Sequence, residues 1–295
     1  MLEKVDLTKK ISKEEYKAKM PQMEIELGRL QRECRELKIP VMIVFEGFGA
    51  SGKGVQIGKL IQSMDPRGFQ VFPVKAETEE ERMHPFLWRF WTKTPEAGRI
   101  AIFDGSWYRK VLIDRFEKRT REKEIETAFH SIEAFEKQLT DGGTILVKLL
   151  LDIDQKEQKK RFEKLLEKKE TAWRVSQGDR ERNAKYSEYA AMMEEVLYRS
   201  DTKSAPWTVI EATDRRFATV KIYMTVIHAL AEAVEAVQRR RMEEQAIKAA
   251  EQVSGQQEAA EIMRQAGGEL EMLQSSVLSR ADLTLAYGKE EYEKD

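Results

Sequence analysis

A glycine-rich segment set between an apolar run and a helical stretch constrains this sequence more than any other feature. Residues 47–54 contain the pattern G-x-x-x-x-G-K directly after the apolar run 41–45, and a helical periodicity resumes over residues 55–64. Glycines let backbone N–H groups turn toward an anion, and the N-terminus of the following helix adds a favourable dipole. Strand, loop and helix in this order therefore predict a phosphate-binding loop. The alternative is a glycine-rich turn with an exposed lysine.

Three glycines and one lysine of this loop are the candidate phosphate ligands. Gly47, Gly52 and Gly54 supply backbone groups, and Lys53 is placed to reach terminal phosphates as a point charge. Gly54 stands where most such loops carry the Ser or Thr that ligates Mg²⁺. A bound metal ion therefore needs a ligand from elsewhere in the chain.

Asp104 is the natural candidate for that ligand. It ends the apolar run 100–103, so its carboxylate is expected at the carboxyl edge of a neighbouring strand, where open α/β sheets bind their ligands. The predicted role is to hold Mg²⁺ against phosphate oxygens. The alternative, an aspartate that caps a helix, is common at strand ends and is compatible with metal binding.

Short apolar segments alternate with helical stretches along the chain. The apolar segments are residues 41–45, 69–74, 100–103, 144–151 and 207–211. Helical patterns cover residues 8–38 (with a break or N-terminal turn at Pro21), 55–64, a polar and then aromatic stretch ending at Trp91, 124–140 and 155–198. This alternation predicts an α/β fold with a five-stranded parallel sheet covered on both faces.

Composition excludes several classes of protein. The formal charge is −1, from 51 basic and 52 acidic residues, so no bulk attraction to nucleic acid is expected. Mean hydropathy is −0.59, and no window is expected to reach the roughly 20 apolar residues of a membrane span. A single cysteine, Cys34, excludes an intramolecular disulfide and suits a reducing compartment. We therefore expect a cytoplasmic protein with neither nucleic-acid nor membrane partners.

The end of the sequence resembles its beginning. Residues 278–292 match residues 2–16 without a gap, which favours duplication over chance similarity. The sequence predicts a helical segment at 1–38, a phosphate-loop domain at 39–235 with a lid at about 155–200, a helical linker at 236–275 with interruptions near 254–255 and 267–268, and the start of a second repeat at 276–295.

A basic stretch follows Asp104. Residues 109–121 hold six basic and two acidic side chains, and Arg109 and Lys110 are its members nearest to the expected strand end. Such a stretch suits one wall of a channel for a polyanion. The alternative is a solvated helix face whose charges pair four residues apart.

Several blocks together resemble the polyphosphate kinase 2 family. They are the loop 45–54, the block 103–108, the block 205–210 and the shorter matches 66–69, 85–91 and 161–162. The resemblance runs over residues 1–235 and is greatest to the N-terminal domain of the tandem subclass, the polyphosphate:AMP phosphotransferases.

The resemblance implies a three-layer P-loop kinase fold with a helical lid. It implies phosphoryl transfer between inorganic polyphosphate and a nucleotide (AMP, ADP or ATP) with Mg²⁺ as cofactor. By position, Lys53, Asp104 and Arg161 match catalytic residues, Arg161 standing at the start of the lid. Arg174 lies in a segment that resembles a lid sequence with a Trp, a basic residue and a Ser.

Departures from the family pattern leave two functions open. Gly49 and Gly105 stand where members usually carry Asp and Arg, and Lys110 replaces a further Arg. One well-placed electrostatic group is worth about 3–4 kcal/mol of transition-state stabilisation. The chain is therefore either a phosphotransferase domain that is weak alone, or a degenerate binding and dimerisation half that supports an active second domain. In both cases we expect a homo-oligomer or pairing with a second domain. A conventional ATP-dependent nucleoside monophosphate kinase fits the loop but explains neither the block 104–108 nor the repeat at the end of the sequence.

Overall fold

A five-stranded parallel sheet forms the centre of the molecule in the computed structural model, which describes residues 2–252 and 261–270. Its strands are β1 (Val41–Gly47), β2 (Phe69–Pro73), β3 (Ile100–Asp104), β4 (Ile145–Asp152) and β5 (Trp207–Glu211). They lie in the order β2-β3-β1-β4-β5, and every neighbouring pair is parallel. The predicted α/β class and all five predicted strands are confirmed.

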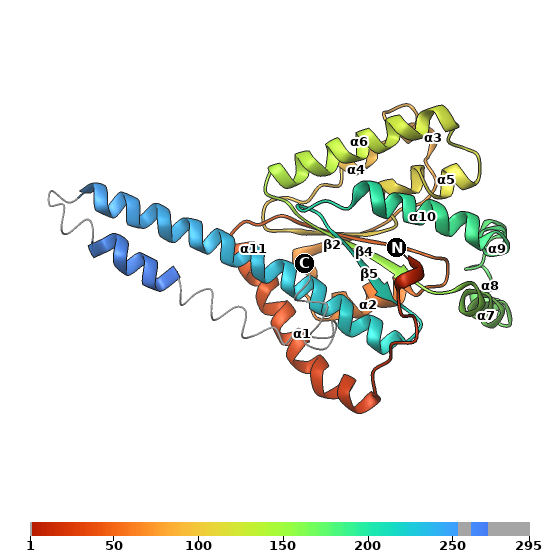
Figure 1. The fold of residues 1–295 in the computed structure, drawn as a ribbon, viewed down its shortest axis with the longest axis horizontal. Helices are drawn as coiled ribbons and strands as arrows, with labels where there is room; N and C mark the ends of the chain where they lie inside the picture. The colour runs from red at the N-terminus through yellow and green to blue at the C-terminus, as the bar shows by residue number, and fades with distance from the viewer. Residues whose placement is uncertain (1, 253–260, 271–295) are drawn as a thin grey trace.

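Helices cover both faces of the sheet, which makes three layers. They are α1 (Lys13–Glu36), α2 (Lys53–Gln62), α3 (Glu79–Arg82), α4 (Trp88–Trp91), α5 (Ile113–Phe116), α6 (Glu122–Asp141), α7 (Gln155–Leu166), α8 (Lys169–Ala172), α9 (Gln177–Ala184), α10 (Tyr186–Ser200) and α11 (Arg215–Gln252), with short 3-10 turns η1 (Leu2–Lys4), η2 (Pro66–Gly68) and η3 (Trp107–Lys110). Figure 1 shows α1, α2 and α11 on one face and α6 and α10 on the other. With both faces covered, β1 is buried along its whole length, as its apolar sequence requires.

The predicted break at Pro21 is absent. A capping box between Ser12 and Glu15 starts α1, and the helix continues through Pro21 to Glu36. Proline removes one backbone donor, but α1 packs along α11 and buries Leu27 and other apolar side chains there, so tertiary contacts hold the helix together. Cys34 lies fully buried in the same face, and burial raises the pKa of its thiol to about 12.

Two stretches predicted as single helices are divided. The polar and then aromatic stretch forms α3 and α4, with Pro85 between them. The predicted lid helix is four helices, α7 to α10. Asp154 caps α7, and a capping box between Ser176 and Asp179 starts α9 as a new helix. Local capping therefore decides where the lid turns.

Helix α11 runs without a break from Arg215 to Gln252, across residues 235 and 236, where the sequence placed a domain boundary. Within the described chain it is the one helix long and apolar enough to cross a membrane, at a mean hydropathy of 1.3, so the expectation that no such window exists is wrong. Because 78% of that window is buried inside the fold, its apolar composition serves the core. The predicted interruption at 267–268 is also wrong, since residues 261–270 are helical, whereas 254–255 and 276–295 lie outside the described residues.

A buried ion pair anchors the turn that follows β3. Lys148 of β4 is fully buried, and its Nζ donates to Glu136 Oε2 at 2.8 Å and to the Ser200 carbonyl at 2.6 Å. Glu136 Oε1 in turn accepts hydrogen bonds from Trp107 Nε1 and the Tyr108 hydroxyl. Elements η3, α6, β4 and α10 are therefore joined beneath the sheet edge that carries Asp104.

Candidate active site

The loop after β1 has a backbone path that only glycine permits at two positions. Gly47 has φ of 132°, and a Cβ there would lie 2.2 Å from the Leu151 carbonyl oxygen. Gly52 has φ of 109° and immediately precedes the first turn of α2. These two glycines let the loop turn sharply from the end of β1 into the N-terminus of α2. The backbone donors of that terminus are a binding place for an anion.

Lys53 places its charge inside this loop. Its Nζ donates to the carbonyl oxygens of Gly47 at 2.8 Å and Phe48 at 3.3 Å. An ammonium group carries three donors, so these two bonds leave capacity for a ligand oxygen. The predicted lysine and the predicted glycines therefore lie together at the carboxyl end of β1.

Asp104 lies beside Gly54, where the missing Ser or Thr would stand. It pairs with Phe45 in the parallel register of β3 and β1, and its Oδ2 is 4.0 Å from the position that a Cβ on Gly54 would take. Within residues 2–252 and 261–270, no group of three or more His, Cys, Asp and Glu side chains could hold a metal ion alone. Mg²⁺ usually takes one or two carboxylates, with phosphate oxygens and water completing its shell. Asp104 at this edge therefore fits Mg²⁺ that arrives with a phosphate ligand.

Glu46 is a site residue that the sequence analysis missed. Its carboxyl group is buried at the end of β1, and Ser106 Oγ donates to Glu46 Oε1 at 2.8 Å. Burial raises the pKa of Glu46, the Lys53 charge opposes that shift, and Asp104 adds to it. The available signal was a single acidic residue in an otherwise apolar strand.

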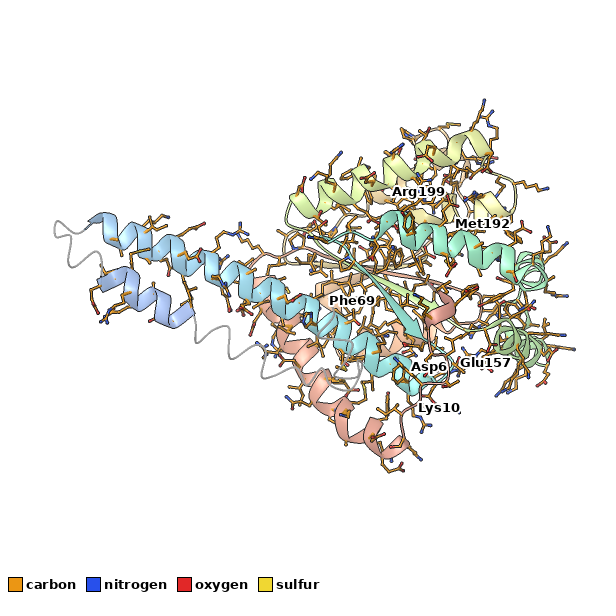
Figure 2. All side chains as sticks on the ribbon, in the orientation of Figure 1. Asp6, Lys10, Phe69, Glu157, Met192 and Arg199 are labelled. Carbon is orange, nitrogen blue, oxygen red and sulfur yellow. The ribbon has the colours of Figure 1, made fainter. Side chains whose placement is uncertain are left out.

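Arg161 braces the loop through its backbone. Its Nη1 donates to the carbonyl oxygens of Ala50 and Ser51, and its Nη2 to those of Ala212 and Thr213. Its Nε donates to Glu157, which Figure 2 labels on α7, so all five N–H groups have protein acceptors. In this structure Arg161 positions the loop against the β5–α11 connection instead of offering donors to a phosphate.

Gly49 is closely covered by the lid. Gln158 Nε2 of α7 donates to the Gly49 carbonyl at 3.0 Å. A Cβ on Gly49 would lie 3.1 Å from both Asp179 Oδ1 and Phe162 Cζ, which is tighter than ordinary packing. A side chain at this position, such as the aspartate of the family pattern, therefore requires the Asp179 and Phe162 side chains to give way by a few tenths of an ångström.

Gly105 departs from the family pattern for a different reason. Its φ is 75°, which lies in the left-handed region, while the nearest atom to an added Cβ is 3.6 Å away on Val74. Space for a side chain exists, but an arginine here would strain the backbone of the turn after Asp104.

Arg109 carries donors that the protein leaves unused. Its Nε lies 3.4 Å from Asp114 Oδ1, yet within the described chain this buried nitrogen has no hydrogen-bond partner. Asp114 instead accepts two hydrogen bonds from Arg119, at 3.1 and 2.7 Å. A mostly buried guanidinium whose nearest acid is occupied elsewhere is suited to bind an anion.

The remaining predicted basic residues, Lys110 and Arg174, contact aromatic rings. Lys110 Nζ is 5.9 Å from the ring centroid of Phe86, and the exposed Arg174 guanidinium lies over the indole of Trp173. Neither has a hydrogen bond to the loop among the described residues. The loop, Asp104 and Arg109 are therefore the candidate site, and Arg174 lies exposed on the lid.

Comparisons with known proteins give one consistent family. The family model described as Polyphosphate kinase 2 matches residues 10–240. Polyphosphate:AMP phosphotransferase of Pseudomonas syringae pv. tomato is 36% identical over 79% of this chain and 47% of its own length, and that of Pseudomonas aeruginosa is 35% identical over 78% and 46%. The crystal structure of polyphosphate kinase 2 from Arthrobacter aurescens superposes with a TM-score of 0.74 at 30% identity, covering 79% of this chain and 85% of that one. The chain spans about half the length of the two curated relatives.

Proposed function

Since this chain belongs to the polyphosphate kinase 2 family, we propose that it transfers a phosphoryl group between inorganic polyphosphate and a nucleotide, AMP or ADP, with Mg²⁺. The observation that carries the proposal is the joint position of Lys53 in the loop and Asp104 beside Gly54. The names of the relatives, which include polyphosphate:AMP and ADP-polyphosphate phosphotransferases, support the substrate class.

Transfer by this site needs positioning and charge neutralisation, without a covalent intermediate on the protein. The loop backbone and Lys53 hold one phosphate chain at the N-terminus of α2, and Arg109 offers its unused donors to an adjacent phosphate group. Asp104 is the carboxylate that would hold Mg²⁺, which supplies neutralisation of phosphate oxygens when bound. Glu46 accepts a hydrogen bond from Ser106, which caps η3, and so fixes the start of the turn that contains Arg109.

A second candidate function is a binding half that supports an active partner domain. The crowding at Gly49 and the left-handed backbone at Gly105 favour it, because both make the usual family side chains costly in this fold. The partner would be a second domain or a second copy, and the half-length match to the curated relatives supports the former. In either case we propose a cytoplasmic location, supported by the single buried thiol.

The test incubates the purified chain with Mg²⁺, polyphosphate and either AMP or ADP, and follows nucleotide phosphorylation by chromatography. We expect product, and we expect Lys53→Ala to reduce its rate by at least about a hundredfold, because the charge in the loop is lost. A parallel arm with ATP as the phosphoryl donor separates polyphosphate use from that of a conventional nucleotide kinase.

Binding measurements on the same samples separate the two candidates. Retained binding of nucleotide and polyphosphate with no product would contradict independent activity and favour the supporting role. Unchanged binding in Lys53→Ala would show that the loop assignment is wrong.

A further inference from the structure

Tyr189 on lid helix α10 buries its ring, and no described residue forms a hydrogen bond with its hydroxyl. Tyr189 is 5% exposed, and its ring meets Phe48 of the phosphate loop and Phe116 of α5 edge to face, with centroids 6.0 and 5.6 Å apart. The Arg182 guanidinium lies 5.9 Å from the same ring. Among the residues that the structure describes, none forms a hydrogen bond with the Tyr189 hydroxyl.

Four charged side chains act electrostatically on this hydroxyl. Burial raises the pKa of Tyr189 above its usual value, with Arg182 and Arg109 opposing the shift and Glu46 and Asp179 adding to it. These four side chains come from α9, η3 and β1, so the hydroxyl lies where the lid meets the loop and the turn after β3. It also stays protonated near neutral pH and remains a hydrogen-bond donor.

A second unused donor lies in the same neighbourhood. The buried Nε of Arg109 has no hydrogen-bond partner within the described chain, as noted above. Buried donors in folded proteins are nearly always satisfied, so the buried Arg109 Nε, together with a tyrosine hydroxyl that no described residue bonds, points to acceptor atoms of a ligand. Phosphate oxygens accept from hydroxyl and guanidinium donors alike, and such charge-assisted bonds are the stronger kind.

We propose that the Tyr189 hydroxyl donates a hydrogen bond to a phosphate oxygen of the substrate held at the loop, next to Arg109. This inference rests on the proposed function and adds a residue of the lid to its phosphate site. The main support is the edge-to-face contact between Tyr189 and Phe48. Because the phosphate loop itself holds the tyrosine ring, the hydroxyl is already in position before a ligand binds.

The same helix provides a matched control. Tyr186 also packs on Phe48, stacked with centroids 4.8 Å apart, but its hydroxyl donates to the Ile153 carbonyl at 2.7 Å. The two tyrosines therefore share an element and an aromatic neighbour, and they differ in whether the protein satisfies the hydroxyl. Replacement by phenylalanine removes that group alone and keeps the ring.

The experiment measures binding and unfolding for the full chain, Tyr189→Phe and Tyr186→Phe. Calorimetric titrations use tripolyphosphate, AMP and ADP separately, each with Mg²⁺. We expect Tyr189→Phe to weaken at least one of them about ten- to hundredfold, the range for a hydrogen bond to a charged group, with an unchanged or higher Tm. Tyr186→Phe should lower the Tm and leave the dissociation constants unchanged.

The ligand whose affinity falls identifies the source of the phosphate oxygen, polyphosphate or nucleotide. Wild-type binding of all three ligands by Tyr189→Phe would overturn the proposal, and so would a loss of Tm equal to that of Tyr186→Phe. A wild-type chain that binds none of the three would instead overturn the proposed function, and the assignment of Tyr189 with it.

Discussion

Two arginines near the phosphate loop have the same charge and opposite surroundings. Arg161 of α7 makes five hydrogen bonds to protein oxygens, four of them to backbone carbonyls of the loop and the β5–α11 connection. Within the described residues, the buried Nε of Arg109 on η3 forms no hydrogen bond, and the nearby Asp114 accepts hydrogen bonds from Arg119 instead. A guanidinium whose donors are all bonded to protein acts as scaffold, whereas one with an unbonded buried donor is a candidate ligand contact.

The same division extends to the neighbours of each arginine. On the scaffold side, Gln158 bonds to the Gly49 carbonyl and α7 lies fixed against the loop. On the other side, Asp104 lies beside Gly54, and among the described residues neither the Arg109 Nε nor the Tyr189 hydroxyl has a hydrogen-bond partner. We therefore expect substitutions on the scaffold side to change stability and those on the other side to change affinity.

The largest effect on the free energy of unfolding is expected for Arg161→Met. This substitution leaves the Glu157 carboxylate and four carbonyl oxygens without their shared donor, which costs about 3–5 kcal/mol of unfolding free energy. Urea unfolding followed by tryptophan fluorescence measures the loss. A stable Arg161→Met variant with selectively weakened phosphate binding would reverse the assignment of the two arginines.

The second-largest effect on stability is expected at Asp152, a buried acid at the end of β4. Burial, with Glu211 and Asp154 adding to it, raises the pKa of Asp152 to about 6. Because the folded chain binds the Asp152 proton more tightly than the unfolded chain does, this proton stabilises the fold. Its contribution to the free energy of unfolding is fully present below about pH 4 and is lost as pH rises through 6. Asp152→Asn should therefore match the wild type at pH 4 and be more stable by up to about 3 kcal/mol at pH 8. Urea midpoints at the two pH values measure this, and a difference independent of pH would contradict it.

The smallest change in stability is expected for Arg109→Met. Asp114 keeps both hydrogen bonds from Arg119, so the unfolding free energy should change by less than about 1 kcal/mol. Affinity for tripolyphosphate should fall about ten- to hundredfold, because a charge-assisted contact is lost. Titration calorimetry together with urea unfolding separates these effects, and Lys118→Met in the same basic stretch serves as the surface control.

The fold followed closely from the sequence because strands buried on both faces leave an unmistakable apolar signal. All five apolar segments became strands within about two residues of their predicted ends. The division of the lid into four helices could not be predicted in this way. It depends on capping by residues such as Asp154 and Ser176, which are hard to recognise inside a long charged helical pattern. Pro21 was misjudged because the packing of α1 on α11 outweighs a single lost hydrogen bond.

The positions of the candidate site residues follow from the sequence where a motif fixes the backbone, whereas positions that depend only on packing do not. The structure places Lys53 and Asp104 together at the loop, as their spacing indicated. Glu46 and Tyr189 belong to no motif, and a sequence does not show how many acceptors surround Arg161. Reversing the departures at Gly49 and Gly105 looks simple in sequence, but the structure attaches crowding to the first and backbone strain to the second.

The solitary thiol of α1 has a practical consequence. Cys34 is fully buried with a pKa near 12, so almost none of it is the nucleophilic thiolate at neutral pH. Maleimide dyes should therefore leave the native fold unlabelled, without any cysteine having to be removed first. A single cysteine introduced beside the exposed Trp173 would then carry the only fluorophore, and opening of the lid becomes an optical signal that can be timed against substrate arrival.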